Sequence, residues 1–165
     1  MHASKLLIVT SLSALFALTA CQKAPETRSA ENVPTAREAA PRTFESGDYV
    51  VHYNAITTDQ LLPEAARAYG ISRSKTQALL NVVLHKKTTG SDTVSTSGKV
   101  SAKANNLTGQ LKNLEMEEIR DGDVIYYIGQ TSIADGEFLT FKIQATPDGE
   151  TTPIDVTFQQ QFYTK

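Results

Sequence analysis

From Phe44 onward, apolar and polar side chains alternate along short runs, and this two-residue period constrains the fold more than any other feature. Leu139, Phe141 and Ile143 alternate with polar neighbours that include Lys142, which is typical of a strand that buries one face. Lys103 lies on the polar side of the run 94–104 in the same way. The run 124–128 is apolar on both sides, which predicts a strand inside a sheet. The chain is therefore expected to be all-β. The expected strands cover residues 49–55, 80–85, 94–104, 114–119, 124–128, 138–145 and 154–162.

Three Asp-Gly pairs separate the strands of the C-terminal half, at Asp121-Gly122, Asp135-Gly136 and Asp148-Gly149. Glycine readily adopts the positive φ that tight hairpin turns require, and aspartate is common beside it. The spacing of these pairs predicts an antiparallel meander of consecutive hairpins.

One short helix is expected after the first long strand. Pro63 suits a first helical turn, residues 64–69 are mostly helix formers, and Gly70 suits the position just past the end. We expect this helix to cross from one sheet to the other. The predicted fold is an antiparallel, immunoglobulin-like β-sandwich over residues 44–165, with a small closed barrel as the alternative that periodicity does not separate.

The first 20 residues have the pattern of a secretory signal peptide. Lys5 precedes a mostly apolar run from Leu6 to Leu18. Thirteen residues in a helix cover roughly 20 Å, which is short of the roughly 30 Å hydrocarbon core of a bilayer. The run therefore predicts a cleaved leader and not a membrane-spanning helix.

The tetrad Leu18-Thr19-Ala20-Cys21 resembles the lipobox of bacterial lipoproteins, and Cys21 is the one cysteine of the chain. The resemblance implies that Cys21 is acylated and becomes the first residue of the mature protein, anchored in a membrane by several acyl chains. Gln22 and Lys23 follow in place of the aspartate that commonly marks inner-membrane retention, which favours the periplasmic face of the outer membrane. Residues 21–43 contain three prolines and no apolar period, which predicts a flexible tether.

Several strings of the predicted β domain resemble a family of small secreted proteins of Gram-negative bacteria. The family is described as domain of unknown function number forty-four twenty-six. The resemblance implies a β domain facing the periplasm over about residues 44–165, and it brings no catalytic residues with it. The strings that carry it lie at residues 47–55, 68–75, 106–110, 125–128 and 158–163.

The charge and cysteine content exclude several classes of function. The formal net charge is −2 and there is no basic cluster, so the electrostatic pattern of a nucleic-acid-binding protein is absent. A single cysteine excludes a disulfide within the chain and a zinc site built from cysteines. We therefore expect no nucleic-acid partner and no cofactor.

The segment 69–75, Tyr-Gly-Ile-Ser-Arg-Ser-Lys, is the most unusual local feature of the chain, because it combines a turn glycine, two cations and two serine hydroxyls. Arg73, Ser74 and Lys75 are candidates for contact with an anion or a partner protein, because a guanidinium can bind a carboxylate or phosphate through two parallel hydrogen bonds. The alternative is an arginine that binds loop carbonyls and holds the helix in place. A further alternative is an enzyme with Ser72 or Ser74 as nucleophile and a histidine as base.

His52 and His85 fall on the polar faces of their predicted strands. If these strands are neighbours, the two imidazoles could share a metal such as copper, with Asn54 or Asn81 nearby. No third ligand follows at close spacing, so we expect no metal site. The function predicted from the sequence is a non-enzymatic binding or accessory module of the cell envelope, held at the membrane through Cys21 and contacting an envelope protein. The alternative is a periplasmic copper-handling protein that uses His52 and His85.

Overall fold

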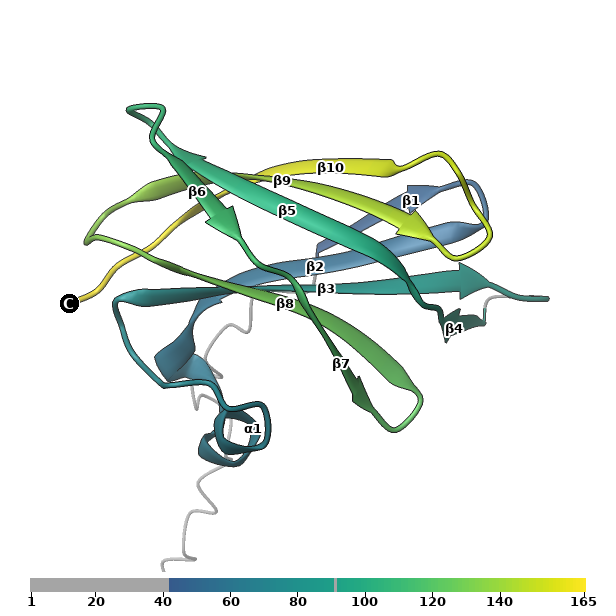
Figure 1. Ribbon diagram of the computed structural model, residues 1–165, viewed down its shortest axis with the longest axis horizontal. Coiled ribbons are helices and arrows are strands. Elements are labelled where there is room, and N and C mark those ends of the chain that lie inside the picture. The colour runs from purple at the N-terminus through teal and green to yellow at the C-terminus, as the bar shows by residue number, and fades with distance from the viewer. Residues whose placement is uncertain (1–41, 91) are drawn as a thin grey trace, which may run out of the picture. The chain divides into compact units, whose positions relative to one another are not determined.

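The computed structural model describes residues 42–90 and 92–165, which form two antiparallel β-sheets packed face to face (Figure 1). The predicted leader, Cys21 and the tether up to residue 41 lie outside the described residues. Sheet A has the strand order β1-β2-β3-β8-β7, with β4 paired to β3, and sheet B has the order β10-β9-β5-β6. The strands are β1 (Arg42–Ser46), β2 (Tyr49–Thr57), β3 (Gln77–Lys87), β4 (Thr93–Ser95), β5 (Gly98–Asn106), β6 (Leu111–Leu114), β7 (Glu117–Asp121), β8 (Val124–Ser132), β9 (Phe138–Pro147) and β10 (Ile154–Gln161).

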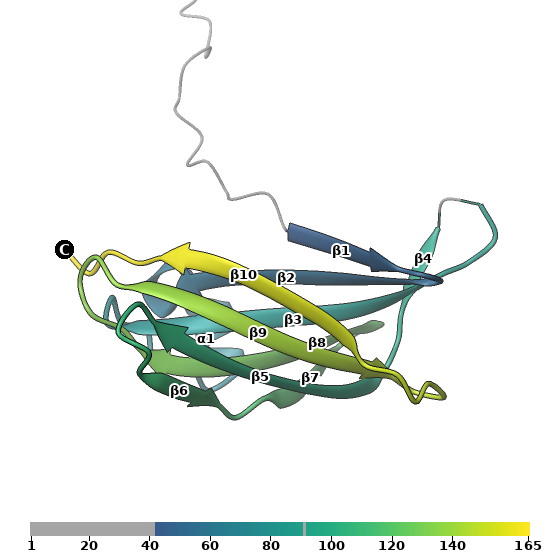
Figure 2. The same ribbon diagram turned by 90° about the horizontal axis from the view of Figure 1, so that it is seen from above.

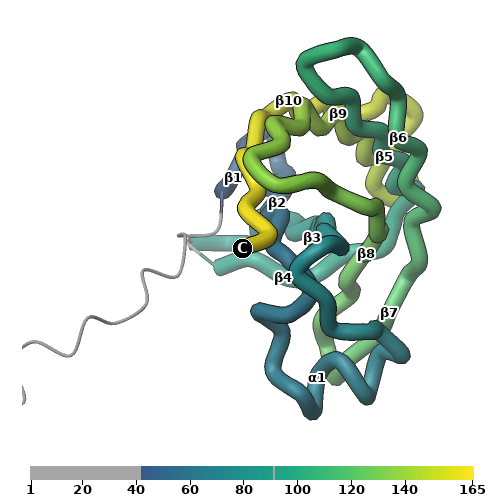
Figure 3. Tube along the Cα trace, turned by 90° about the vertical axis from the view of Figure 1, so that its left-hand side faces the viewer, coloured from purple at the N-terminus to yellow at the C-terminus, as the bar shows by residue number. Residues whose placement is uncertain are grey.

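The strand order confirms the immunoglobulin-like sandwich. Strands β2-β3-β8-β7 match the A-B-E-D sheet of that fold, and β10-β9-β5-β6 match its G-F-C-C′ sheet. Two separate layers are visible end-on in Figure 3, each with its own edge strands, so the barrel alternative is wrong. β1 begins at Arg42, inside the range that the sequence assigns to the tether.

The core lies between the two sheets and is built from alternate residues of their strands. Leu80 and Leu84 of β3 and Leu139 and Phe141 of β9 are fully buried. The rings of Phe141 and Phe158 stack with their centroids 4.9 Å apart. The period-2 pattern of the sequence therefore identified the inward faces correctly.

The segment between β2 and β3 contains a 3-10 turn, η1 (Thr58–Gln60), and the helix α1 (Pro63–Ala68). The helix ends as predicted, with Gly70 at φ +66° just past its last turn. Both strands belong to sheet A, so the expected crossing to the other sheet is wrong. The segment instead folds back over the outer face of sheet A, below it in Figure 1. In the described part of the chain, no helix is long and apolar enough to cross a membrane.

Two of the three Asp-Gly pairs form hairpins. Asp121-Gly122 joins β7 to β8, and Asp148-Gly149 follows β9 in the connection to β10. The third pair, Asp135-Gly136, carries the chain from β8 in sheet A to β9 in sheet B. The predicted meander is therefore wrong, because a turn pattern reports a local reversal and not the sheet that the next strand joins.

Two of the expected strands are each divided between the sheets. The run 94–104 splits into β4 in sheet A and β5 in sheet B, and the run 114–119 splits into β6 and β7. β5 begins at Gly98, where a Cβ atom would lie 2.5 Å from the carbonyl oxygen of Thr146. Only glycine fits this close approach, which marks the point where the chain enters sheet B. In Figure 2 the strands of sheet B lie over those of sheet A.

Candidate functional site

The segment 72–75 is held against the end of sheet A by the buried hydroxyl group of Thr58. This hydroxyl donates to the carbonyl oxygens of Ser72 and Ser74, at 2.9 and 3.1 Å, and accepts the backbone N–H of Ser74 at 2.8 Å. Thr58 has no exposed surface. The Thr58 side chain therefore makes three of the hydrogen bonds that fix the path of the segment, and the N–H of Asp59 adds another to the Ser74 carbonyl oxygen at 3.3 Å.

The three residues predicted for anion or partner contact have different roles here. Arg73 donates a hydrogen bond from Nη2 to the carbonyl oxygen of Asp59, which is the structural alternative considered for it. The Ser74 hydroxyl bonds the Thr76 hydroxyl at 2.9 Å and accepts the Thr76 N–H. Lys75 is exposed, as is Arg73. The contacts of Arg73 and Ser74 are thus made within residues 58–76, the connecting segment that joins β2 to β3.

The same segment lies far from both histidines. Ser74 contacts Thr58, which lies six residues beyond His52 along an extended chain, or about 20 Å at the rise of a β-strand. His85 is opposite Val50 and lies farther still. The described geometry therefore provides no serine–histidine pair from Ser72 or Ser74.

His52 and His85 do come together, as the sequence suggested for neighbouring strands. β2 and β3 are paired, and the two imidazoles meet on the outer face of sheet A with ring centroids 4.7 Å apart in an edge-to-face arrangement. The Nδ1 atom of His85 lies 3.3 Å from the Thr93 hydroxyl oxygen. Burial, and after it the charge of His52, lowers the pKa of His85 below its ordinary value. Both effects favour the neutral imidazole, which is the form that binds metals.

Asn81 lies on the same face, diagonal to His52 across the β2–β3 ladder. Its side-chain oxygen is buried and has no hydrogen-bond partner among the described residues. A buried polar atom without a partner costs stability. Asn81 therefore presents an unpaired oxygen on the face that carries His52. Within the described residues, no three histidine, cysteine or acidic side chains gather closely enough to hold a metal ion.

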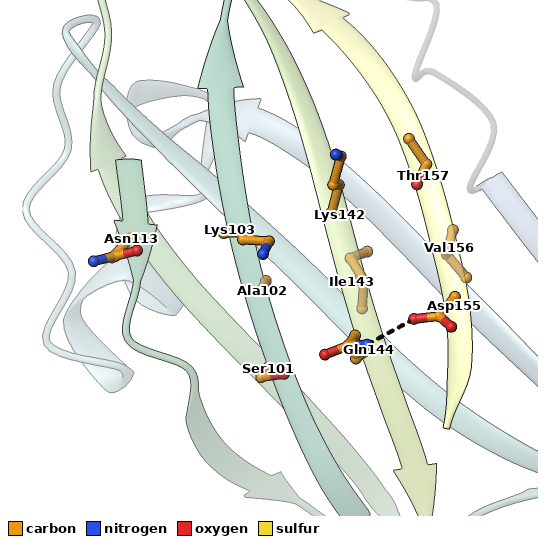
Figure 4. A pocket seen from close by; sticks show the side chains of 10 residues that line it. All are labelled: Ser101, Ala102, Lys103, Asn113, Lys142, Ile143, Gln144, Asp155, Val156 and Thr157. Carbon is orange, nitrogen blue, oxygen red and sulfur yellow. Dashed lines mark hydrogen bonds between the residues drawn. The ribbon is translucent and has the colours of Figure 1, made fainter. Parts of the chain in front are cut away.

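The outer face of sheet B carries a second cluster, which the sequence analysis missed. In the register of the sheet, Asn113 of β6 is opposite Lys103 of β5, Lys103 is opposite Lys142 of β9, and Lys142 is opposite Thr157 of β10. These four exposed side chains form one row across all four strands, which we call the lysine row (Figure 4). No described carboxylate lies within 4.0 Å of either ammonium group.

The lysine row lines a shallow hollow of about 520 Å³ on the surface of sheet B. The neighbouring row contains Ser101, Gln144 and Asp155, and the Gln144 amide donates to the Asp155 carboxylate at 3.0 Å (Figure 4). Asp155 therefore has a partner in its own row. Lys103 and Lys142 were both recognised as outward-facing from the sequence, but their strands are far apart in the chain. Only the pairing of β5 with β9 brings them together.

Comparisons with solved structures support the fold. A DUF4426 family protein from Pseudomonas aeruginosa PAO1 has 29% sequence identity and a TM-score of 0.65, over 76% of this chain and 96% of that one. Two structures of FetP from uropathogenic Escherichia coli strain F11 share the fold alone. One was expressed in the periplasm of E. coli, with 9% identity, a TM-score of 0.53 and coverage of 76% and 95%. The other is a copper-bound variant, with 14% identity, a TM-score of 0.52 and coverage of 76% and 97%.

Sequence comparisons identify the family to which the chain belongs. Among curated proteins, no match to this sequence is found. The family model for the domain of unknown function DUF4426 matches residues 43–165, which is the whole described sandwich apart from its first residue. The chain therefore belongs to the DUF4426 family.

Proposed function

We propose that this protein is a lipoprotein of the periplasmic face of the outer membrane, whose sandwich is a non-enzymatic binding or accessory module of the envelope. The lipobox-like tetrad ending in Cys21 supports the anchor, and the proline-containing segment after it supports a tether. The periplasmic expression of FetP, which shares the fold, agrees with this location.

The observation that carries the binding role is the open outer face of sheet B. Its lysine row places two ammonium groups directly opposite each other on paired strands, an arrangement that destabilises a sheet. A surface that the fold does not need, and that costs it stability, is a natural place for a ligand or a partner. The envelope partner of this module would bind at that face.

The anchor is tested by replacing the acylated residue. Intact-mass measurement of membrane-extracted wild-type protein should show a chain that begins at Cys21 and carries acyl groups. The Cys21→Ala variant should lack the acyl mass and leave the washed outer-membrane fraction, whereas the matched Lys23→Ala variant should remain there. An unmodified thiol at position 21 in membrane-extracted wild-type protein would refute the anchor.

The binding role is tested by photo-crosslinking in intact cells at two exposed positions. A photoreactive residue replaces Thr157 on the outer face of sheet B or, as the control, Gln130 on the outer face of sheet A. We expect an adduct of one defined mass from position 157 and none from position 130. Equal adducts from both positions, or none from position 157, would argue against a binding role for sheet B.

A second candidate, copper handling, is favoured by the contact between His52 and His85. Two imidazoles in contact, with the unpaired Asn81 side-chain oxygen on the same face, suit a copper ion better than a hard cation such as magnesium. The copper-bound FetP variant shows that a protein of this fold can hold copper.

Metal analysis decides between the candidates. The full chain, purified in detergent without chelators, would contain close to one equivalent of copper if this candidate is correct. The double variant His52→Ala and His85→Ala should then contain none, while Asn54→Ala should retain the metal. Copper absent from the wild-type protein, or equally present in the double variant, would remove this candidate and leave the binding module.

A further inference from the structure

The charge of the described domain is unevenly distributed. Residues 42–165 contain 12 lysine and arginine residues against 15 aspartate and glutamate residues. Three of the lysines, Lys99, Lys103 and Lys142, but one of the acids, Asp155, lie at outward positions of the strands of sheet B. The remainder of the domain therefore has nine basic and 14 acidic residues. A local positive surface on an acidic domain attracts a discrete anion and repels an extended anionic surface.

The lysine row supplies donors on both sides of its two ammonium groups. Side chains directly opposite on paired strands have Cβ atoms about 5 Å apart, so both ammonium groups can reach the same group of ligand oxygens. The Asn113 amide and the Thr157 hydroxyl extend the row at its two ends (Figure 4). Charge-assisted hydrogen bonds from lysine to phosphate oxygens are short and strong.

The hollow has the size of a small-molecule site. Its volume of about 520 Å³ lies within the range of roughly 300–1,000 Å³ that is usual for ligand pockets. Ser101 and Gln144 in the neighbouring row are polar groups of the kind that bind sugar hydroxyls. A single phosphate would use the lysines, and an attached sugar would occupy the rest of the hollow.

We propose that the lysine row is a phosphate-binding site, and that its ligand is a phosphorylated saccharide of the envelope. This inference rests on the proposed binding function and adds the ligand class to it. Lys103 and Lys142 bind the phosphate oxygens, while Asn113 and Thr157 orient the phosphate. The saccharide lies along the neighbouring row, over Ser101 and Gln144. In the absence of ligand, the two lysines repel each other and lower the stability of the sheet.

The test is thermal unfolding of the full chain in detergent, at constant ionic strength. The chain has no tryptophan, so circular dichroism follows the transition. Glucose 1-phosphate at 10 mM should raise the Tm by about 3 °C or more, as expected when a ligand binds the folded state alone. Glucose at the same concentration should leave the Tm unchanged. No shift with glucose 1-phosphate would overturn the proposal.

Substitutions distinguish binding at the lysine row from a general attraction of anions to the positive face of sheet B. Without ligand, Lys103→Thr and Lys142→Thr should each raise the Tm, by about 2 °C, because the repulsion is removed. Each should also abolish most of the shift caused by glucose 1-phosphate. The matched variant Lys99→Thr removes a lysine from the same face but outside the row, and it should keep the shift. Equal loss in all three variants would overturn the proposal.

Lipid vesicles distinguish the other source of phosphate. Vesicles of phosphatidylglycerol, compared with vesicles of phosphatidylcholine, should not bind a Cys21→Ala chain through the lysine row. Binding that Lys103→Thr abolishes would overturn the saccharide proposal in favour of a lipid headgroup. If the phosphate response is absent but the adduct at position 157 forms, then the ligand class is wrong and the binding module stands.

Discussion

The two outer faces of the sandwich differ in what covers them. The outer face of sheet A carries Leu79 and Ile128, which are buried because Ile71 of the connecting segment packs on them. The outer face of sheet B has polar residues at most positions and no covering segment among the described residues. Sheet A therefore contributes to stability through both of its faces, while sheet B leaves its outer face free for contact.

Connection length explains why the faces differ. Residues 58–76 join β2 to β3, which is long enough to fold back over sheet A and bury an apolar cluster. In sheet B, residues 107–110 join β5 to β6 and residues 148–153 join β9 to β10. These connections are short and stay at the ends of their strands. The outer surface of sheet B is therefore uncovered.

The largest expected effect comes from emptying the covered face. Leu79→Ala should lower the free energy of unfolding by about 3 kcal/mol, because Leu79 is 4% exposed and its truncation leaves a cavity beneath the connecting segment. Gln144→Ala on the outer face of sheet B should change it by less than about 0.5 kcal/mol. Urea denaturation followed by circular dichroism measures both. Equal losses in the free energy of unfolding for the two variants would show that the covered face of sheet A adds no more to stability than the outer face of sheet B.

The next largest change in stability is expected at Thr58, whose hydroxyl group holds the connecting segment. Thr58→Val keeps the shape of the side chain but leaves the N–H of Ser74 without its partner, at a cost of about 2 kcal/mol in the free energy of unfolding. Thr157→Val, the matched change on sheet B, should cost less than about 0.5 kcal/mol because that hydroxyl is exposed. An unchanged midpoint for Thr58→Val would show that the hydroxyl does not hold the segment.

A smaller change in stability is expected at Arg73, the exposed arginine of the connecting segment. Arg73→Ala removes the hydrogen bond to the Asp59 carbonyl oxygen and should cost about 1 kcal/mol in the free energy of unfolding. Lys75→Ala should have no measurable effect on stability. If instead Arg73→Ala leaves the stability unchanged but removes a crosslinked partner, then Arg73 serves the contact predicted from the sequence.

The smallest effect is the pH dependence that arises from the histidine pair. Burial, and after it the charge of His52, lowers the pKa of His85 below the ordinary value of 6.5. The unfolded chain therefore takes up this proton at a higher pH than the folded one. The stability due to His85 is complete above pH 6.5 and is lost as the pH falls from there through the lowered pKa. His85→Gln should remove this step from Tm measured against pH, and an identical profile would contradict the assignment.

Much of the local structure could be predicted from the chain. The inward faces of β3 and β9, the helix between Pro63 and Gly70, and the hairpin turns at Gly122 and Gly149 all follow from residues close in sequence. The sequence predicted that His52 and His85 both lie on the polar faces of their strands, but not that these faces meet. Their contact depended on two strands being neighbours, which alternation does not report.

The remaining features depend on pairs of residues that are distant in the chain. Lys103 and Lys142 were each predicted to face outward, yet their opposition exists only because β5 pairs with β9. The run 94–104 has the alternation of one strand, but Gly98 lets the chain pass from one sheet to the other. The turn at Asp135-Gly136 changes sheet for a similar reason, since reversal and sheet membership are separate properties.

Residues close together in the chain set which side of each strand is buried, because the two-residue period is a property of the extended backbone. Which strands are neighbours, which outer face is covered and which polar side chains meet depend on the folded domain. Strand pairing requires two apolar faces to be buried against each other, and this condition involves the whole domain at once.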